Sequence, residues 1–293
     1  MSAIQRTQPS PLFRLHYSDF VRAALAEDLG RAGDLTTDAV VPIGERARGL
    51  IVARRAGCLA GLDVAAEAFR ALEPTDDLIT VIKPLHQDGD VVPAATPVLE
   101  IEGSARVLLA AERVALNLLG RLCGIATTTR SLVDAVADHR AAIACTRKTT
   151  PGLRALEKYA VRCGGGANHR FGLDDAVLIK DNHRVIAGSA AEAVRRARAH
   201  VGHLVKIEVE IDDIAELEPV LALGVDAVLL DNMSTDELRQ AVEINAGRAV
   251  LEASGGITPD TASAIAATGV DLLSVGWLTH SSPALDVGFD FLD

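Results

Sequence analysis

Basic side chains stand in short groups along the second half of this chain. The chain as a whole carries a net charge of −11, so a local gathering of cations runs against its general sign. Guanidinium and ammonium groups bind carboxylates and phosphates through charge-assisted hydrogen bonds. The pattern therefore predicts a site for a substrate with several negative charges. The cationic candidates are Arg147, Lys148, His169, Arg170 and Lys180.

Carboxylates follow the same groups along the chain. Glu208 and Glu210 lie in KIEVEI, Asp231 lies in LLDN, and Asp181 comes directly after Lys180. Carboxylate oxygens are the ligands that hard divalent cations such as Mg²⁺ prefer. The acids therefore indicate that a divalent metal accompanies the anionic substrate.

Glycines and serines follow the last two apolar runs. Ser254, Gly255 and Gly256 lie in EASGGITP, and Gly276 lies in SVGWLTHS. Backbone N–H groups in such a loop before a helix bind phosphate. Taken singly, each group also has an ordinary structural interpretation. Glycine pairs are common in loops, and Lys180 with Asp181 could be an exposed ion pair on the surface. The shared position of all these groups after apolar runs is what favours one common site.

Repeated units of an apolar run and a helix position these groups. The runs end near Lys148, Lys180, Glu210, Asp231, Ser254 and Gly276, at intervals of 21 to 32 residues. That interval suits a strand, a helix and two loops. Apolar runs without alternation are typical of parallel strands buried on both faces. The sequence contains no GxGxxG motif after the first run, which argues against a dinucleotide-binding fold. We predict an open βα barrel of about six parallel strands, whose strand ends meet at one mouth.

The first part of the chain differs from these repeats. It mixes strand-like runs such as ARGLIVARRAG with turn-rich segments such as DGDVVPAATPVLEIEG, which indicates a separate N-terminal α/β sandwich domain. We predict a first domain over residues 1–110 and a barrel domain over 111–280. The C-terminal tail, about 281–293, is a candidate to pack with the first domain.

Composition excludes several classes of protein. The net charge argues against nucleic acid held by general electrostatics. No run of about 18 apolar residues predicts a membrane span, and the N-terminus lacks a signal-peptide core. The four cysteines show neither disulfide nor zinc spacing, so we expect free thiols and a cytoplasmic protein.

The chain resembles the quinolinate phosphoribosyltransferase family, also called carboxylating nicotinate-nucleotide pyrophosphorylases. The most specific block is TRKTTPGLRALEKYAVRCGGGANHRFGLDDAVLIKDNH, residues 146 to 183. EDLGRAGDLTTD, AERVALNLL, EVE, LLDN, SGGI and VGWLTHS are similar as well, so the resemblance covers nearly the whole chain. It implies an N-terminal α/β sandwich domain, an open βα barrel, and a dimer whose active sites are shared, with further assembly left open.

The resemblance also implies roles for individual residues. Quinolinate, a pyridine with two adjacent carboxylates, would be lined by Arg147, His169, Arg170 and Lys180, with Arg113 contributed across the dimer. Lys148 would lie near phosphoribosyl pyrophosphate as a catalytic residue. The catalytic acids Glu210 and Asp231 would hold Mg²⁺ directly, or through phosphoribosyl pyrophosphate or water. The 5′-phosphate end would be met by Ser254, Gly255, Gly256, Gly276, His280 and Ser281.

The implied reaction belongs to de novo NAD biosynthesis. The pyridine nitrogen attacks the anomeric carbon of the ribose, pyrophosphate leaves, and the pyridinium then stabilises the carbanion left by departing CO₂. The products are nicotinate mononucleotide, pyrophosphate and CO₂. The glycine run 164–166 would let the backbone approach closely and leave room for a flat aromatic acid.

Three alternatives remain open from the sequence. One is a related phosphoribosyltransferase with another acceptor, such as the paralogue of molybdenum-transport operons. A second is a Schiff-base aldolase that uses Lys148 or Lys180 as its nucleophile. A third is a barrel that binds phosphosugars without turnover.

Overall fold

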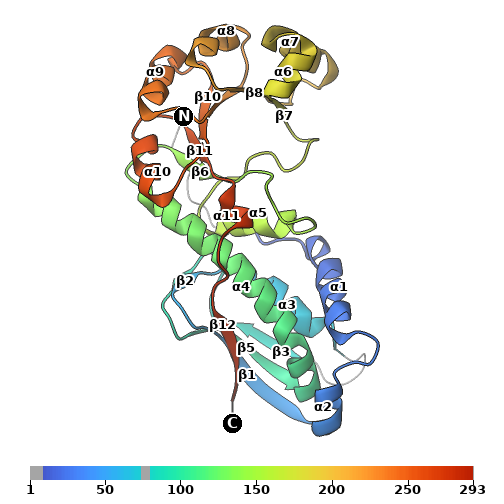
Figure 1. Ribbon diagram of the computed structural model, residues 1–293. Coiled ribbons are helices and arrows are strands. Elements are labelled where there is room, and N and C mark those ends of the chain that lie inside the picture. Colours follow the sequence, from blue (N-terminus) through green and yellow to red (C-terminus); the bar gives the residue numbers. More distant parts are fainter. Residues whose placement is uncertain (1–8, 74–79, 293) are drawn as a thin grey trace. The chain divides into compact units, whose positions relative to one another are not determined.

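Two compact units make up the chain in the computed structural model, which describes residues 9–73 and 80–292. We call them the barrel unit and the antiparallel unit (Figure 1). The division predicted from the sequence stays a prediction, and its boundary at residues 110 and 111 falls inside one continuous helix, α4 (Ala105–Ala135). The barrel unit holds 131–148 and 166–278, and the antiparallel unit holds 9–73, 80–130, 149–165 and 279–292.

A six-stranded parallel sheet is the centre of the barrel unit. Its strand order is β6-β11-β10-β9-β8-β7, so that β6 and β7 are its two edges. This order confirms the predicted open βα barrel. The strands are β6 (Ala142–Ala144), β7 (Val177–Ile179), β8 (Ile207–Ile211), β9 (Ala227–Asp231), β10 (Val250–Ser254) and β11 (Leu272–Ser274).

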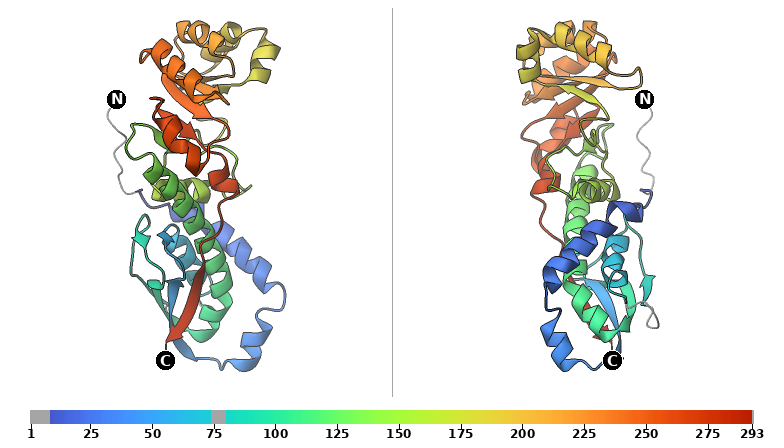
Figure 2. Two further views of the ribbon diagram at one scale, coloured as in Figure 1. Left: turned by 60° about the vertical axis from the view of Figure 1, so that its left-hand side comes forward. Right: turned by 90° about the vertical axis from the view of Figure 1, so that its right-hand side faces the viewer.

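Helices cover the outer face of this sheet. Val194, Leu217, Leu238 and Ala262, one from each of four helices, are buried in the same apolar cluster as the outward residues of the strands. The helices lie along one side of the strands in Figure 1 and form a layer in the right-hand view of Figure 2. They are α6 (Asp181–Ala187), α7 (Ala190–His200), α8 (Leu217–Ala222), α9 (Thr235–Asn245) and α10 (Pro259–Ala266); the short helices η2 (Ile214–Glu216) and α11 (Trp277–His280) also occur.

The strands of the barrel unit alternate between two faces, which corrects the expectation of unpatterned apolar runs. In β8, Ile207, Val209 and Ile211 belong to the apolar cluster, whereas Glu208 and Glu210 do not. β9 and β10 follow the same rule. Because successive side chains of a strand point to opposite faces, one face packs against helices and the other carries polar groups.

The antiparallel unit contains two sheets. One has the strand order β12-β1-β5-β3 and the other pairs β2 with β4, all antiparallel. It confirms the predicted N-terminal α/β domain. The strands are β1 (Arg46–Ala53), β2 (Gly57–Cys58), β3 (Val81–Pro84), β4 (Val91–Val92), β5 (Thr96–Ser104) and β12 (Val287–Leu292). The helices are η1 (Arg14–His16), α1 (Ser18–Leu29), α2 (Leu35–Val40), α3 (Leu62–Arg70), α5 (Arg154–Cys163) and most of α4.

The C-terminal tail packs within this unit. β12 pairs with β1 from Arg48↔Leu292 to Ala53↔Val287, which is where the sequence analysis placed the tail as a candidate. On α4, a Cβ at Gly124 would lie 2.0 Å from the carbonyl oxygen of Pro283. A glycine is therefore required there for the tail to cross the helix.

The glycine run 164–166 also serves close packing. A Cβ at Gly164 would lie 2.5 Å from the carbonyl oxygen of Ala126 and 2.6 Å from Cβ of Thr129, both on α4. Gly165 has φ +88°, a left-handed conformation that favours glycine. The close approach predicted for this run is therefore an approach to α4, where the end of α5 meets that helix.

Two further expectations can be checked against the described residues. All four cysteines are buried, and none of them forms a disulfide within the described chain, which agrees with the expectation of thiols. Over residues 9–73 and 80–292, none of the helices combines the length and the apolar character that crossing a membrane requires.

Candidate active site

A pocket of about 450 Å³ opens at the carboxyl ends of the barrel strands. The register places these ends level, with Ser254 beside Asp231 on one side and beside Ser274 on the other. Most of the residues that the sequence analysis assigned to the site line this one pocket. Its lining is Thr146, Arg147, Lys148, His169, Arg170, Leu178, Lys180, Glu210, Leu229, Asp231, Glu252, Ser254 and Ser274.

Two guanidinium groups occupy one part of the pocket. Burial, and then the positive charge of Arg147, lower the pKa of Arg170. Arg170 Nη1 donates to the carbonyl oxygen of Ala176 at 3.1 Å. The buried Nε of Arg147 has no hydrogen-bond partner among the described residues. An anion that accepts from these groups would satisfy the unused donor and relieve the repulsion between the two cations.

Lys180 and Glu210 form an ion pair at the ends of β7 and β8. Ile179 pairs with Val209, and this register brings the residue after each of them to the same level. The Lys180 side chain remains 47% exposed, so its ammonium also remains within reach of a ligand in the pocket. Lys148 follows β6, and its backbone N–H donates to Thr146 Oγ1 at 3.0 Å.

Acidic residues gather beside the ion pair. Asp231 ends β9, and its Oδ2 accepts from Asn232 Nδ2 at 2.8 Å. Glu210 and Asp231 also line a neighbouring smaller pocket of about 70 Å³. Mg²⁺ prefers oxygen ligands, so the carboxylates around this space are the candidates to hold it. The remaining residues of the smaller pocket are Asp181, Arg184, Ile211 and Asp212.

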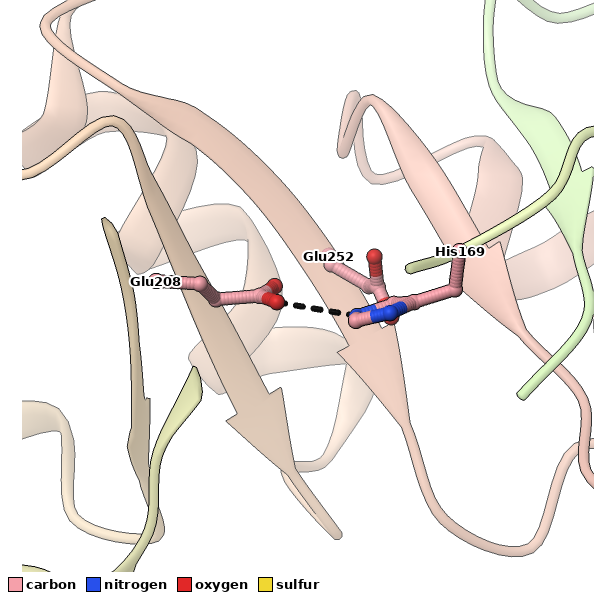
Figure 3. A group of neighbouring side chains, drawn as sticks. All are labelled: His169, Glu208 and Glu252. Atoms are coloured by element: carbon pink, nitrogen blue, oxygen red, sulfur yellow. Dashed lines mark hydrogen bonds and ion pairs between the residues drawn. The ribbon is translucent and has the colours of Figure 1, made fainter. Parts of the chain in front are cut away.

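A second acidic group lies deeper in the barrel unit and contains His169. Its Nε2 lies 2.9 Å from Glu208 Oε2 and 3.7 Å from Glu252 Oε1. Figure 3 shows the imidazole pointing at the carboxylate of Glu208, which comes from β8, while Glu252 comes from β10. One potential ligand atom from each residue lies within 4.8 Å of the others. Burial, and then the charge of Glu208, raise the pKa of Glu252 to about 7.

The predicted phosphate loop has the backbone that glycine allows. Gly255 has φ +94° and Gly256 has φ +61°. A Cβ at Gly255 would lie 2.0 Å from Oδ1 of Asn232, so no larger residue fits there. Ser254 lines the pocket, whereas the two glycines do not appear in its lining.

Gly276 supports the pocket rather than lining it. A Cβ at this position would lie 2.8 Å from Cδ of Lys148 and 3.4 Å from Thr146 Oγ1. The next residue, Trp277, is half-buried, and its Nε1 donates to the carbonyl oxygen of Ile257 at 2.8 Å. Glycine at 276 therefore leaves room for the lysine stem, and the tryptophan packs within the same unit.

Three residues of the predicted site belong to the antiparallel unit, and their roles stay predictions. Arg113 lies on α4 with a 64% exposed side chain, 3.9 Å from the carboxylate of Glu112. His280 Nδ1 and Ser281 Oγ are hydrogen-bonded at 2.6 Å.

The sequence analysis missed several lining residues, of which Glu252 carries the most chemistry. Its side chain is only 3% exposed. It stands two residues before Ser254 in VLEAS, so it lies on the same face of β10 as that serine. This alternation is the signal that could have found it. The other missed residues are Thr146, Leu178, Leu229 and Ser274.

Comparisons with known proteins agree over most of the chain. Family models match for the quinolinate phosphoribosyl transferase N-terminal domain over residues 34–123 and C-terminal domain over residues 125–290. A probable nicotinate-nucleotide pyrophosphorylase (carboxylating) of Bacillus subtilis is 45% identical, over 90% of this chain and 89% of its own. The nicotinate-nucleotide pyrophosphorylase (carboxylating) of Mycobacterium leprae is also 45% identical, over 93% and 96%. The solved nicotinate-nucleotide pyrophosphorylase of Francisella tularensis superposes with a TM-score of 0.91 at 38% identity, over 98% of this chain and 99% of that chain.

Proposed function

The chain belongs to the quinolinate phosphoribosyltransferase family, and we propose on this premise that it transfers a phosphoribosyl group from phosphoribosyl pyrophosphate to quinolinate with loss of CO₂. The products are nicotinate mononucleotide, pyrophosphate and CO₂, and we assign the step to de novo NAD biosynthesis. The observation that carries the proposal is the single pocket that joins Arg147 and Arg170 to Glu210 and Asp231.

Arg147, Arg170 and Lys180 bind the two carboxylates of quinolinate. A dianion enters a partly buried pocket only if its charges are met, and the unused Nε of Arg147 supplies one of the donors. Charge-assisted bonds of this kind contribute about 1.5–3 kcal/mol each. The arginines thereby hold the pyridine ring in a fixed orientation, which lowers the entropic part of the barrier.

Glu210 and Asp231 would hold Mg²⁺ together with phosphoribosyl pyrophosphate, directly or through water. When bound, the ion would supply positive charge at the departing pyrophosphate. Lys148 adds a further cation near the phosphoribosyl donor, and Ser254 contacts its 5′-phosphate. These contacts are worth most where negative charge grows during the reaction.

The bonds change in two stages. The pyridine nitrogen forms a bond to the anomeric carbon as the bond from that carbon to pyrophosphate breaks. The carbon–carbon bond to the adjacent carboxylate then breaks, CO₂ leaves, and the electron pair stays on the ring carbon, which takes up a proton. The positive charge of the pyridinium stabilises that electron pair, so no protein nucleophile is required.

The test is an assay of CO₂ release from quinolinate labelled in the carboxylate next to the nitrogen. We expect release only when phosphoribosyl pyrophosphate and Mg²⁺ are both present, and loss of release when a chelator removes the metal. Binding of phosphoribosyl pyrophosphate without any CO₂ release would favour the phosphosugar-binding alternative. Trapping of an adduct at Lys148 or Lys180 by borohydride would favour the aldolase.

Arg170→Ala tests the quinolinate site directly. We expect the variant to fold and to lose measurable quinolinate binding, because a partly buried guanidinium that would pair with a substrate carboxylate is removed. Arg195→Ala is the matched control, since Arg195 pairs with Glu192 on the surface of α7. Normal quinolinate affinity in Arg170→Ala would contradict the assignment.

A further inference from the structure

We propose that Trp277 is a positioning residue, which holds the loop 254–258 in the shape that receives the phosphate of a phosphosugar. We call this segment the phosphate loop. The proposal rests on the proposed function for the assignment of a 5′-phosphate to the loop. It gives a function to a tryptophan that stands beside the glycine of VGWLTHS and that the reaction does not otherwise use.

Unused backbone N–H groups make the phosphate loop a place for an anion. Over residues 9–73 and 80–292, no hydrogen bond joins the N–H groups of Gly255, Gly256 and Ile257 to an acceptor. Gly255 and Gly256 both have positive φ, so the chain turns tightly between Ser254 and Ile257. Successive N–H groups in such a turn form a concave site for phosphate. Its affinity then depends on how firmly the turn keeps this shape before the ligand arrives.

Asn232 fixes the start of the turn. Its backbone N–H donates to the carbonyl oxygen of Ser254 at 2.8 Å. Because a trans peptide unit is planar, with its C=O and N–H pointing in opposite directions, this bond also sets the direction of the Gly255 N–H. The first N–H of the glycine pair is therefore aimed away from Asn232.

Trp277 fixes the end of the turn in the same way. Its Nε1 donates to the carbonyl oxygen of Ile257 at 2.8 Å. The N–H of the same peptide unit, that of Thr258, donates to Thr261 Oγ1 at 2.9 Å. This peptide unit is thus held on both sides, by the indole and by the first turn of α10. The two peptide units between the fixed ends carry the N–H groups of Gly256 and Ile257, which remain for the ligand.

The indole makes this contact from a fixed base. Trp277 begins α11 and packs against the apolar cluster of the barrel unit, to which the buried side chain of Ile257 also belongs. An indole has a single N–H donor on a rigid ring, so packing of the ring also places the donor. The loop is therefore formed before a phosphate arrives, and binding costs less conformational entropy.

Trp277→Phe tests the proposal, because phenylalanine keeps an aromatic ring and lacks the N–H. We expect the calorimetric Kd for ribose 5-phosphate to rise about three- to tenfold, the range for one lost hydrogen bond, and the Kd for quinolinate to stay at its wild-type value. Thr268→Val is the matched control, since Thr268 Oγ1 donates to the carbonyl oxygen of Ile265 at the other end of α10. It should change neither Kd. Unchanged ribose 5-phosphate affinity in Trp277→Phe, or equal weakening of both ligands, would overturn the proposal.

The indole N–H itself can be observed by NMR, because the chain contains one tryptophan and nitrogen-labelled protein gives one indole signal. We expect this signal to exchange slowly with water, as a hydrogen-bonded N–H does. We expect it to shift when ribose 5-phosphate is added and not when ribose is added, a comparison that isolates the phosphate. A signal that stays in place while calorimetry shows ribose 5-phosphate bound would overturn the proposal, whether or not Trp277→Phe folds.

Ribose 5-phosphate separates this proposal from the proposed function, because its binding needs no catalysis. A wild-type protein that binds it and responds at Trp277, yet releases no CO₂ from quinolinate, would contradict the proposed function and support the role of Trp277. A wild-type protein that releases CO₂ but shows no binding of ribose 5-phosphate would leave the function standing and overturn the roles of the phosphate loop and of Trp277.

Discussion

Lys180 and Glu210 form an ion pair across β7 and β8, although the two residues are assigned to different substrates. The proposed function places the lysine at the quinolinate end of the pocket and the glutamate at the Mg²⁺ end. Glu210 is 16% exposed and Lys180 is 47% exposed, so the pair lies where the pocket meets solvent. An exposed pair of this kind contributes only about 0–1 kcal/mol to stability. Its importance therefore lies in function, since it joins the two ends of the pocket.

Substitution of each partner should separate the two ends. We expect Lys180→Met to raise KM for quinolinate by about tenfold or more, because a charge-assisted contact is lost, and to change KM for phosphoribosyl pyrophosphate less. We expect the reverse for Glu210→Gln. Steady-state kinetics with each substrate varied in turn measures both constants.

The control for this pair is Lys206→Met. Lys206 also pairs with an acid, Asp226, but it precedes β8 and so lies at the opposite end of that strand. Its removal should leave both KM values at the wild-type level. Loss of affinity for the same substrate in both Lys180→Met and Glu210→Gln would refute the division of roles.

Gly276→Ala should slow turnover without unfolding the protein. The new methyl group would lie 2.8 Å from Cδ of Lys148, and a flexible lysine stem moves aside easily. We expect Tm to change little and kcat to fall by about tenfold or more, toward the ~10²-fold loss expected for Lys148→Ala. Calorimetry and initial rates measure the two quantities.

Gly202→Ala is the matched control for Gly276→Ala, because a Cβ there meets nothing within 4 Å. It should change neither Tm nor kcat. A Gly276→Ala enzyme with wild-type kcat would mean that the position of Lys148 is unimportant, and wild-type kcat in Lys148→Ala would remove that residue from the site.

The sequence was most informative at the strand ends. Lys148, Lys180 and Asp231 each follow a short apolar run, and parallel strands bring such positions to one edge whatever the rest of the chain does. Glu252 escaped notice because it lies inside the run VLEAS and was taken with its apolar neighbours. Only the alternation of the strand reveals that it faces the pocket.

Packing between distant segments was harder to foresee. The space at Gly164 is required by Ala126 and Thr129, which lie more than thirty residues earlier on α4. The glycine run before His169 was therefore interpreted as leaving room for a ligand, whereas Gly164 packs against helix α4. The chain has no helix-breaking proline between Ala105 and Ala135, and α4 runs through the predicted domain boundary at residue 110.

Mixed chains test the proposal that active sites are shared in a homodimer. Arg113→Ala and Arg170→Ala chains should each be inactive alone. If Arg113 completes the partner's site, a mixed dimer has one site with both arginines intact, and we expect up to about half of the wild-type activity per mixed dimer. Activity after unfolding and refolding the two variants together measures it. No recovery, with mixed dimers shown by mass, would contradict sharing.

Glu252→Gln should change how stability depends on pH. Burial and Glu208 raise the pKa of Glu252 from 4.5 to about 7 in the folded chain. Between these two values the folded state keeps a proton that the unfolded state has lost, so the free energy of unfolding falls as pH rises through this window. One group contributes a slope of at most about 1.4 kcal/mol per pH unit, and glutamine, which does not titrate, removes it.

Denaturant unfolding of wild type and Glu252→Gln at several pH values measures the difference between their free energies of unfolding. The contributions of the carboxylates that the two proteins share cancel in this difference. We expect the curve of the variant to be flatter between 4.5 and 7 and to lie above that of the wild type at the upper end, because the glutamine never has to ionise in the buried group. Glu218→Gln is the control, since Arg248 lowers the pKa of Glu218 and places its titration below the window. Parallel curves for wild type and Glu252→Gln would mean that Glu252 is already ionised in the folded protein, and that the buried group carries both negative charges.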